Sequence, residues 1–262
     1  ELFTKEKMSK KNIEEYYDNP IAYWASKNQS IAFKNGESIT KYVESFQGII
    51  TGNNNKFLRF WYEISKSHIE FHQNNYDALN LDEIYWLPYN KGGEYRKWYG
   101  IQDRVVFWKF EARDKTRGKF AFRDFYLREY VSWSYTVTNN TIAARYYPLG
   151  FLWDVRGSGI FQKKNDTNML MYLEAFLCSK VAFSLFRIKT DALSCQVENI
   201  LQLPIIKDDT KKIVVDNLVR QNNKISKTDW DSFETSWDFQ THPMLAPSAL
   251  DMAGLLTASQ PP

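Results

Sequence analysis

The stretch Val131-Ser132-Trp133-Ser134-Tyr135-Thr136-Val137 is followed, after a turn at Asn139-Asn140, by Thr141-Ile142-Ala143-Ala144-Arg145-Tyr146, and this pair decides the fold class. Both runs are rich in β-branched and aromatic residues, which favour strands. Asparagine tolerates the backbone conformations of tight hairpin turns. The pair therefore predicts an antiparallel β-hairpin.

Other short runs of the same kind lie around this hairpin and are separated by turn clusters at residues 52–55 and 90–93. They predict strands at residues 48–51, 57–64, 85–89, 105–110, 151–155 and 203–206.

The helical patterns lie mainly in the second half of the chain. Residues 169–187 are apolar on almost every side, which predicts one long helix buried against the sheet. A second, amphipathic helix is expected at residues 211–220, with Asp208 and Asp209 capping its start. Trp230, Phe233 and Trp237 have the spacing of one helical face, which predicts docking onto an apolar surface.

Four regions follow from these patterns. Residues 1–45 are expected to form a helical connector, residues 46–206 a folded domain, residues 207–245 a helical extension, and residues 246–262 a flexible tail rich in Pro, Ala and Ser. The predicted fold class is α+β, with a twisted, mostly antiparallel sheet and a long buried helix.

Composition agrees with a folded protein, since 44% of the 262 residues are hydrophobic and 25% are charged. Neither a membrane-spanning run nor a secretion signal is visible, so a cytoplasmic location is expected. Cys178 and Cys195 are expected to be buried small side chains. The first residue is Glu1 rather than methionine, which predicts a piece of a longer protein.

The net charge of +3 is unevenly distributed. Residues 91–128 hold eleven Lys or Arg against five Asp or Glu, interleaved with ten aromatic residues. Cations that bind phosphates, mixed with flat rings, are typical of nucleic-acid surfaces. The alternative is a solvated strand face whose aromatic residues turn into the core.

No catalytic motif is complete. His68 and His72 have the spacing of a helical metal pair, but the glutamate is misplaced and a third ligand is missing, so a metal role is not favoured. Asp209-Thr210-Lys211 is half of a magnesium-dependent nuclease arrangement without a convincing upstream acid. By motifs alone, the chain carries no complete active site.

Five stretches, in this order, resemble the adenine-specific DNA methyltransferases of the BREX phage-defence systems (PglX), which are relatives of type IIG restriction-modification enzymes. They are residues 46–61, 86–100, 143–151, 196–200 and 229–239. The resemblance implies an N-terminal domain that binds S-adenosylmethionine and flips the target adenine, followed by a target-recognition domain. This chain resembles only the second, C-terminal part, so its catalytic and cofactor-binding residues are expected elsewhere and no methylation is expected from the chain alone.

The resemblance implies a fold like that of type I and type IIG recognition domains, with residues 46–206 as the recognition domain. Double-stranded DNA, the protein's own N-terminal methyltransferase domain and other BREX proteins are the expected partners. The alternative is a protein-interaction module, and a nuclease using Asp209 and Lys211 is the third hypothesis.

A recognition domain needs cations for phosphates and rigid polar groups for base edges. We expect base contacts from the loop at residues 90–98, backbone contacts from the basic segment that follows, and a second base or backbone contact from the hairpin. The predicted DNA-binding residues are Asn90, Lys91, Arg96, Lys97, Arg113, Lys115, Arg117, Lys119 and Arg145. The turn at residues 51–55 is a further candidate. Two alternatives stay open: Arg96 pairs with Glu94 or another carboxylate of the fold, and Arg145 only braces the hairpin.

Overall fold

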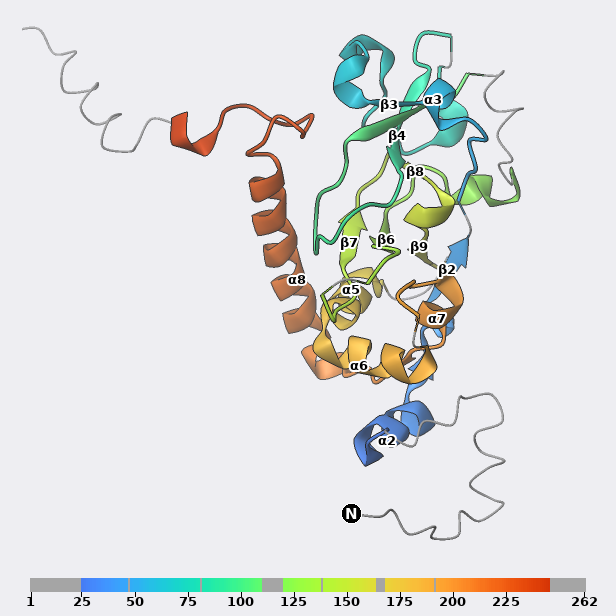
Figure 1. Cartoon of the computed structure of the whole chain (residues 1–262), viewed down its shortest axis with the longest axis vertical. Helices are drawn as coiled ribbons and strands as arrows, with labels where there is room; N and C mark the ends of the chain where they lie inside the picture. Colours follow the sequence, from blue (N-terminus) through green and yellow to red (C-terminus); the bar gives the residue numbers. More distant parts are fainter. Residues whose placement is uncertain are drawn as a thin grey trace, which may run out of the picture.

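The predicted hairpin forms one side of the first of two four-stranded sheets, and its second strand is an edge strand (Figure 1). A computed structural model describes residues 25–46, 48–80, 82–109, 120–137, 139–163, 168–190 and 192–245. In the first sheet the order is β2-β9-β6-β7, and every pairing is antiparallel. Its strands are β2 (Val43–Phe46), β6 (Tyr130–Trp133), β7 (Ala144–Tyr147) and β9 (Gly159–Gln162). Val131 faces Tyr146, so the predicted hairpin is confirmed.

The second sheet has the order β3-β5-β4-β8. Its strands are β3 (Leu58–Phe60), β4 (Trp86–Asn90), β5 (Arg104–Phe107) and β8 (Leu152–Trp153). Only β4 and β8 run parallel among these strands. The expected strands are therefore confirmed but shorter, except that residues 48–51 contribute a single bridge from Ile49 to Asp154.

Aromatic side chains fill the core that these strands share. Tyr130 stacks on Tyr147 with ring centroids 5.1 Å apart and on Phe161 at 4.8 Å. Trp153 and Phe151 are buried in the same cluster. Offset stacks of this kind stabilise a core beyond the area they bury, so much of the aromatic content is structural.

The expected long helix is wrong in one respect, because it is two helices. α5 (Leu170–Cys178) ends at Ser179, which is extended (φ −80, ψ 155) and accepts a hydrogen bond at its hydroxyl from the N–H of Ala182. α6 (Lys180–Lys189) then begins. Burial is confirmed, since Leu173 and Phe186 belong to the cluster that covers β6 and β7.

The N-terminal region departs from the expected helical connector. Residues 1–24 lie outside the described part. α2 (Lys27–Asn35) begins at a capping box on Ser26, but β1 (Glu37–Ser38) then pairs with β10 (Pro204–Ile205), and β2 joins the first sheet. The expected strand at residues 203–206 is confirmed by β10. The expected flexible tail at residues 246–262 also lies outside the described part.

The C-terminal helix α8 (Asp209–Trp230) is longer than predicted and lies along α5. Asp208 caps it as expected, accepting from the N–H of Thr210. Residues 231–238 are turns, so the expected single helical face is wrong. Phe233 is half exposed, whereas Trp237 packs on Phe71 and Phe151 with centroids 5.0 and 5.7 Å apart.

Two short helices complete the described elements, α3 (Asn54–Phe57) before β3 and α7 (Val197–Leu201) before β10. Cys178 and Cys195 are free and buried, as expected. No helix in the described ranges is long and apolar enough to span a membrane. The α+β class with mostly antiparallel sheets is confirmed.

Candidate nucleic-acid interface

Asn90, expected to contact bases, is completely buried at the end of β4. Its amide nitrogen donates to the Ser132 hydroxyl at 3.0 Å and to the Gly157 carbonyl at 2.9 Å. Its amide oxygen accepts from the N–H of Gly92 at 2.9 Å. Asn90 therefore joins the two sheets and fixes the following loop, and base contact by Asn90 stays a prediction.

Lys91 forms an ion pair with Asp154 at 2.5 Å, and a third of its side chain is exposed. The same carboxylate accepts from the Tyr89 hydroxyl at 3.0 Å. Gly92, at φ +77, packs so closely on the Arg156 carbonyl that a Cβ would lie 2.6 Å from the oxygen. The loop after β4 is thus held tightly against the segment after β8.

Arg96 lies against the C-terminal part of α8. One guanidinium nitrogen lies 2.7 Å from a carboxylate oxygen of Asp229, and Nε donates to the Tyr99 carbonyl at 2.7 Å. The guanidinium also lies over the Trp230 ring, 5.2 Å from its centroid. The open alternative, pairing with another carboxylate of the fold, is what the structure shows, and base contact by Arg96 stays a prediction.

Lys97 and Arg145 are also engaged within the fold. Lys97 donates to the Cys178 carbonyl at 2.7 Å, which satisfies a free carbonyl at the end of α5. Arg145 is completely buried, and its Nη1 donates to the carbonyls of Glu94 and Arg96 at 3.1 and 3.0 Å. Arg145 therefore braces the hairpin, and DNA contact by Arg145 stays a prediction.

The other predicted contacts, Arg113, Lys115, Arg117 and Lys119, lie outside the described residues, so these four stay predictions.

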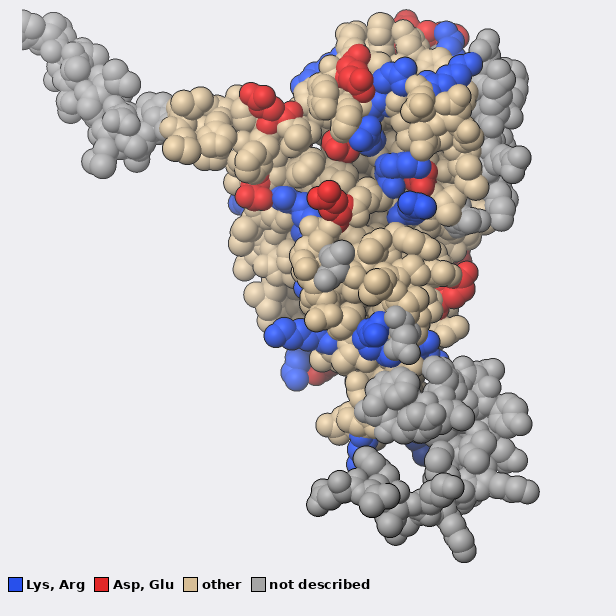
Figure 2. Space-filling model, viewed as in Figure 1, with Lys and Arg blue, Asp and Glu red and all other residues tan. Residues whose placement is uncertain are grey.

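Three adjoining hollows mark a different surface, which we call the groove. The first is about 590 Å³ and the second about 390 Å³, and Lys91 and Arg104 line both. The third is about 410 Å³ and shares Tyr135 and Arg156 with the first. Figure 2 shows Lys and Arg side chains gathered over the half of the molecule that carries β3, β4 and β8, with acidic residues among them.

The second sheet and its loops line most of the first two hollows, whereas Ser45 of β2, Trp133 of β6 and the start of α7 line the third. Asn54 and Asn55, from α3, line the second hollow and are exposed. The charges of the groove are balanced, so it does not form a strongly positive face. The basic residues are Arg59, Lys91, Arg104 and Arg156, and the acidic ones are Glu63, Glu94, Asp103 and Glu198. What the groove offers is a set of guanidinium and amide groups on rigid walls, which suits hydrogen bonding to base edges.

Sequence reasoning missed Arg59, Arg104 and Arg156 as site residues. Arg104 lies in the basic segment of residues 91–128, but so does Arg96, and the sequence does not show which of the two lines the groove. Asn54 and Asn55 belong to the turn at residues 51–55 that was a further candidate, and the structure places them in the groove.

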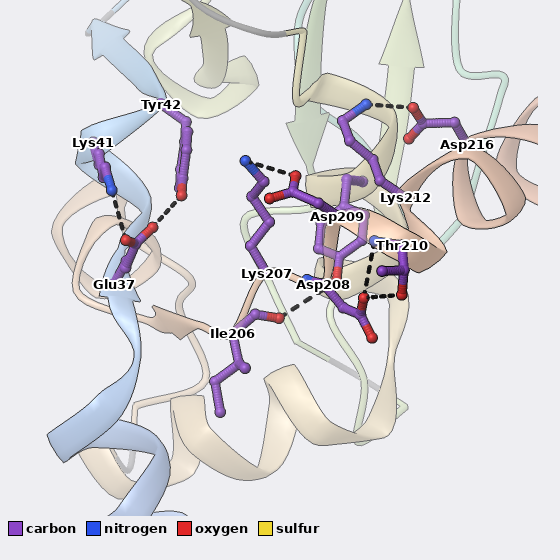
Figure 3. Close-up of polar contacts among 11 residues, drawn as sticks. Glu37, Lys41, Tyr42, Ile206, Lys207, Asp208, Asp209, Thr210, Lys212 and Asp216 are labelled. Carbon is purple, nitrogen blue, oxygen red and sulfur yellow. Dashed lines mark hydrogen bonds and ion pairs between the residues drawn. The ribbon is translucent and has the colours of Figure 1, made fainter.

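The metal and nuclease hypotheses find no support in the described part. His68 ends a short 3-10 turn and stacks on Tyr85, with ring centroids 4.9 Å apart. Asp208 caps α8, while Asp209 pairs with Lys207 at 2.9 Å (Figure 3). No group of three or more His, Cys, Asp or Glu that could hold a metal occurs among the described residues.

Comparison with known proteins gives two relatives. The chain is 33% identical over 245 residues to the adenine-specific methyltransferase PglX of Lacticaseibacillus casei, covering 89% of this chain and 20% of the relative. It is 31% identical over 234 residues to the adenine-specific methyltransferase BrxX of Escherichia coli O9:H4, covering 87% of this chain and 18% of the relative. No family model matches.

The chain thus spans about one fifth of the length of these curated relatives. The resemblance read from the sequence is confirmed, and the chain belongs to the PglX family of adenine-specific methyltransferases.

Proposed function

We propose that this chain recognises the target sequence for an adenine-specific DNA methyltransferase. The observation that carries the proposal is the groove, in which arginine and asparagine side chains line rigid walls, in a chain whose relatives are adenine-specific methyltransferases. Arginine pairs with guanine and asparagine with adenine through two hydrogen bonds each in the major groove of DNA.

We assign S-adenosylmethionine binding and methyl transfer to the part of the protein that corresponds to the remaining four fifths of the relatives. The biological setting that we propose is methylation of host DNA in BREX phage defence. In this arrangement the present chain positions the protein on the DNA duplex, and the other part transfers the methyl group.

Fluorescence anisotropy with a labelled duplex tests the proposal directly. The chain is expected to bind duplex DNA at low salt, and its affinity is expected to fall as salt rises, because phosphate contacts release counterions. An acidic-peptide polymer of similar charge serves as the control ligand. Absence of duplex binding at low salt would contradict the proposal.

A second function, protein contact, is favoured by the outer face of α8. Ile213 and Ile225 are 73% and 68% exposed, and Val214 and Leu218 are more than half exposed on the same helix. Only Val219 of the 22 residues is buried, and the inner face includes Asn223, which bonds to Glu174. We propose that this outer apolar stripe packs against the methyltransferase part of the same protein.

The double variant Leu218→Ser, Ile225→Ser tests this contact. It is expected to leave the melting temperature of the present chain unchanged and to lower that of the full-length protein. Lys211→Ser, on an exposed polar position of α8, is the matched control. Equal melting temperatures for wild-type and variant full-length proteins would contradict the contact.

A further inference from the structure

We propose that Arg104 is a sequence-reading residue that recognises one guanine of the target. This inference rests on the proposed function and deepens it, since it assigns specificity to a residue of the groove rather than to the predicted loop.

Arg104 occupies the meeting point of two hollows. It is the first residue of β5, the strand between β3 and β4, and it faces Phe60 of β3 in register. Its side chain lines both the first and the second hollow. A ligand lying along the groove would pass this guanidinium whichever of these two hollows it entered.

The guanidinium is held in place by a ring rather than by hydrogen bonds. Its central carbon lies 3.4 Å from the centroid of Phe60, and the Phe60 ring stacks on Tyr62 at 5.1 Å with an interplanar angle of 9°. Arginine stacks well on aromatic faces, and stacking leaves the N–H groups in the plane free to donate. The Phe60 ring therefore fixes the orientation of the Arg104 guanidinium and leaves its N–H donors available for a ligand.

Those donors make no hydrogen bond within the described residues. The nearest charged partner is Asp103, with 3.7 Å between Nε and a carboxylate oxygen, which is too long for a hydrogen bond. Arg59, in contrast, donates hydrogen bonds from Nη1 to the carbonyls of Asn55 and Leu58 at 2.6 Å each. Arg96 and Arg145 are bonded within the fold in the same way. Arg156, also in the groove, lies 5.9 Å from the Tyr135 ring centroid, so Arg104 has the closer ring contact, and 36% of its side chain is exposed.

A fixed, planar pair of donors matches the O6 and N7 acceptors of guanine, which is the commonest specific contact of arginine with DNA. A phosphate contact would need only charge, so Lys would replace Arg there, but Lys cannot reproduce the planar fork. This difference separates base reading from backbone binding.

The experiment uses the full-length protein with the variants Arg104→Ala, Arg104→Lys and Arg104→Gln, and maps the sequence around each methylated adenine. All three are expected to lose preference for guanine at one position, by about 10- to 100-fold, while the other positions stay selective. Arg123→Ala is the matched control, because Arg123 pairs with the exposed Asp77 and does not line the groove.

Two outcomes would overturn the inference: wild-type site choice in Arg104→Ala, or full recovery of site choice in Arg104→Lys, which would mean a phosphate contact. Phe60→Leu gives a second, independent reading, since it removes the stacking ring but no charge and is expected to weaken the same guanine preference. If wild-type chain binds duplex DNA while the Arg104 variants keep wild-type site choice, the inference fails and the proposed function stands. If the wild-type chain binds no duplex, the proposed function fails.

Discussion

Arg96 and Asp229, which are 133 residues apart, form an ion pair of 2.7 Å that fastens the last turn of α8 to the loop after β4. Arg96 is mostly buried there, whereas Asp229 is largely exposed. Because Arg96 also bonds to the Tyr99 and Ser226 carbonyls, its loss costs more than an exposed salt bridge would.

Arg96→Ala is therefore expected to lower the free energy of unfolding by about 1–3 kcal/mol. Site choice by the full-length protein should stay unchanged, since the side chain turns toward α8. Chemical denaturation measures the first effect and methylation mapping the second. Altered site choice in a variant that still folds would restore Arg96 as a DNA contact.

Arg145 is expected to contribute more to the stability of the fold than Arg96. It is completely buried and also bonds to the Ser134 hydroxyl at 2.8 Å. Removing it leaves the part-buried Arg96 carbonyl without this donor, whereas the Glu94 carbonyl keeps the Ser134 hydroxyl at 2.6 Å. Arg145→Met is expected to cost about 3 kcal/mol or more of unfolding free energy. A loss below 1 kcal/mol in urea denaturation would contradict the bracing role.

Glu174 makes stability depend on pH. It is completely buried between α5 and α8, and burial raises its pKa to about 8, although the Asn223 amide donates to it at 2.9 Å. Between the usual pKa of 4.5 and about 8, the folded chain holds a proton that the unfolded chain has released. Stability is therefore expected to fall as pH rises through this window, by up to ~1.4 kcal/mol per pH unit from this group.

Glu174→Gln keeps the shape and removes the titration. The variant is expected to lose this part of the pH dependence, so that its stability relative to wild type rises from pH 5 to pH 8. Urea denaturation at both pH values measures the difference. A constant difference between the two proteins across this range would contradict a buried, protonated Glu174.

Ser179 interrupts the apolar run that the sequence presents as one helix. Its hydroxyl caps α6 by accepting from the N–H of Ala182 at 3.1 Å. Ser179→Ala is expected to cost about 1 kcal/mol, and Ser179→Asp is expected to retain the cap. Thermal unfolding compares the two, and equal losses would exclude capping as the cause.

The sequence predicted those elements that depend on interactions between residues close together in the chain. The hairpin of β6 and β7 and the cap at Asp208 were visible because neighbouring residues carry both signals. β9 was missed because its four residues include Gly159, which sits against Tyr130 where a side chain would not fit. The break at Ser179 had a signal, a serine ahead of Lys180, that the apolar run around it obscured.

The candidate site depends on contacts between residues far apart in the chain, which the spacing of residues in the sequence does not reveal. The sequence grouped Arg96 with Arg104 in one basic window, yet Asp229 engages Arg96 and the Phe60 ring leaves the donors of Arg104 free. The charge of the window therefore does not distinguish these two arginines, because packing from other elements decides which cations face solvent.

The central claim is that this chain selects the DNA sequence. Its most direct test exchanges residues 25–245 in the full-length protein for the corresponding segment of the Lacticaseibacillus casei relative and maps methylated adenines in cells. The account predicts that methylation moves to the sites of the donor protein. Methylation that continues at the original sites would contradict it.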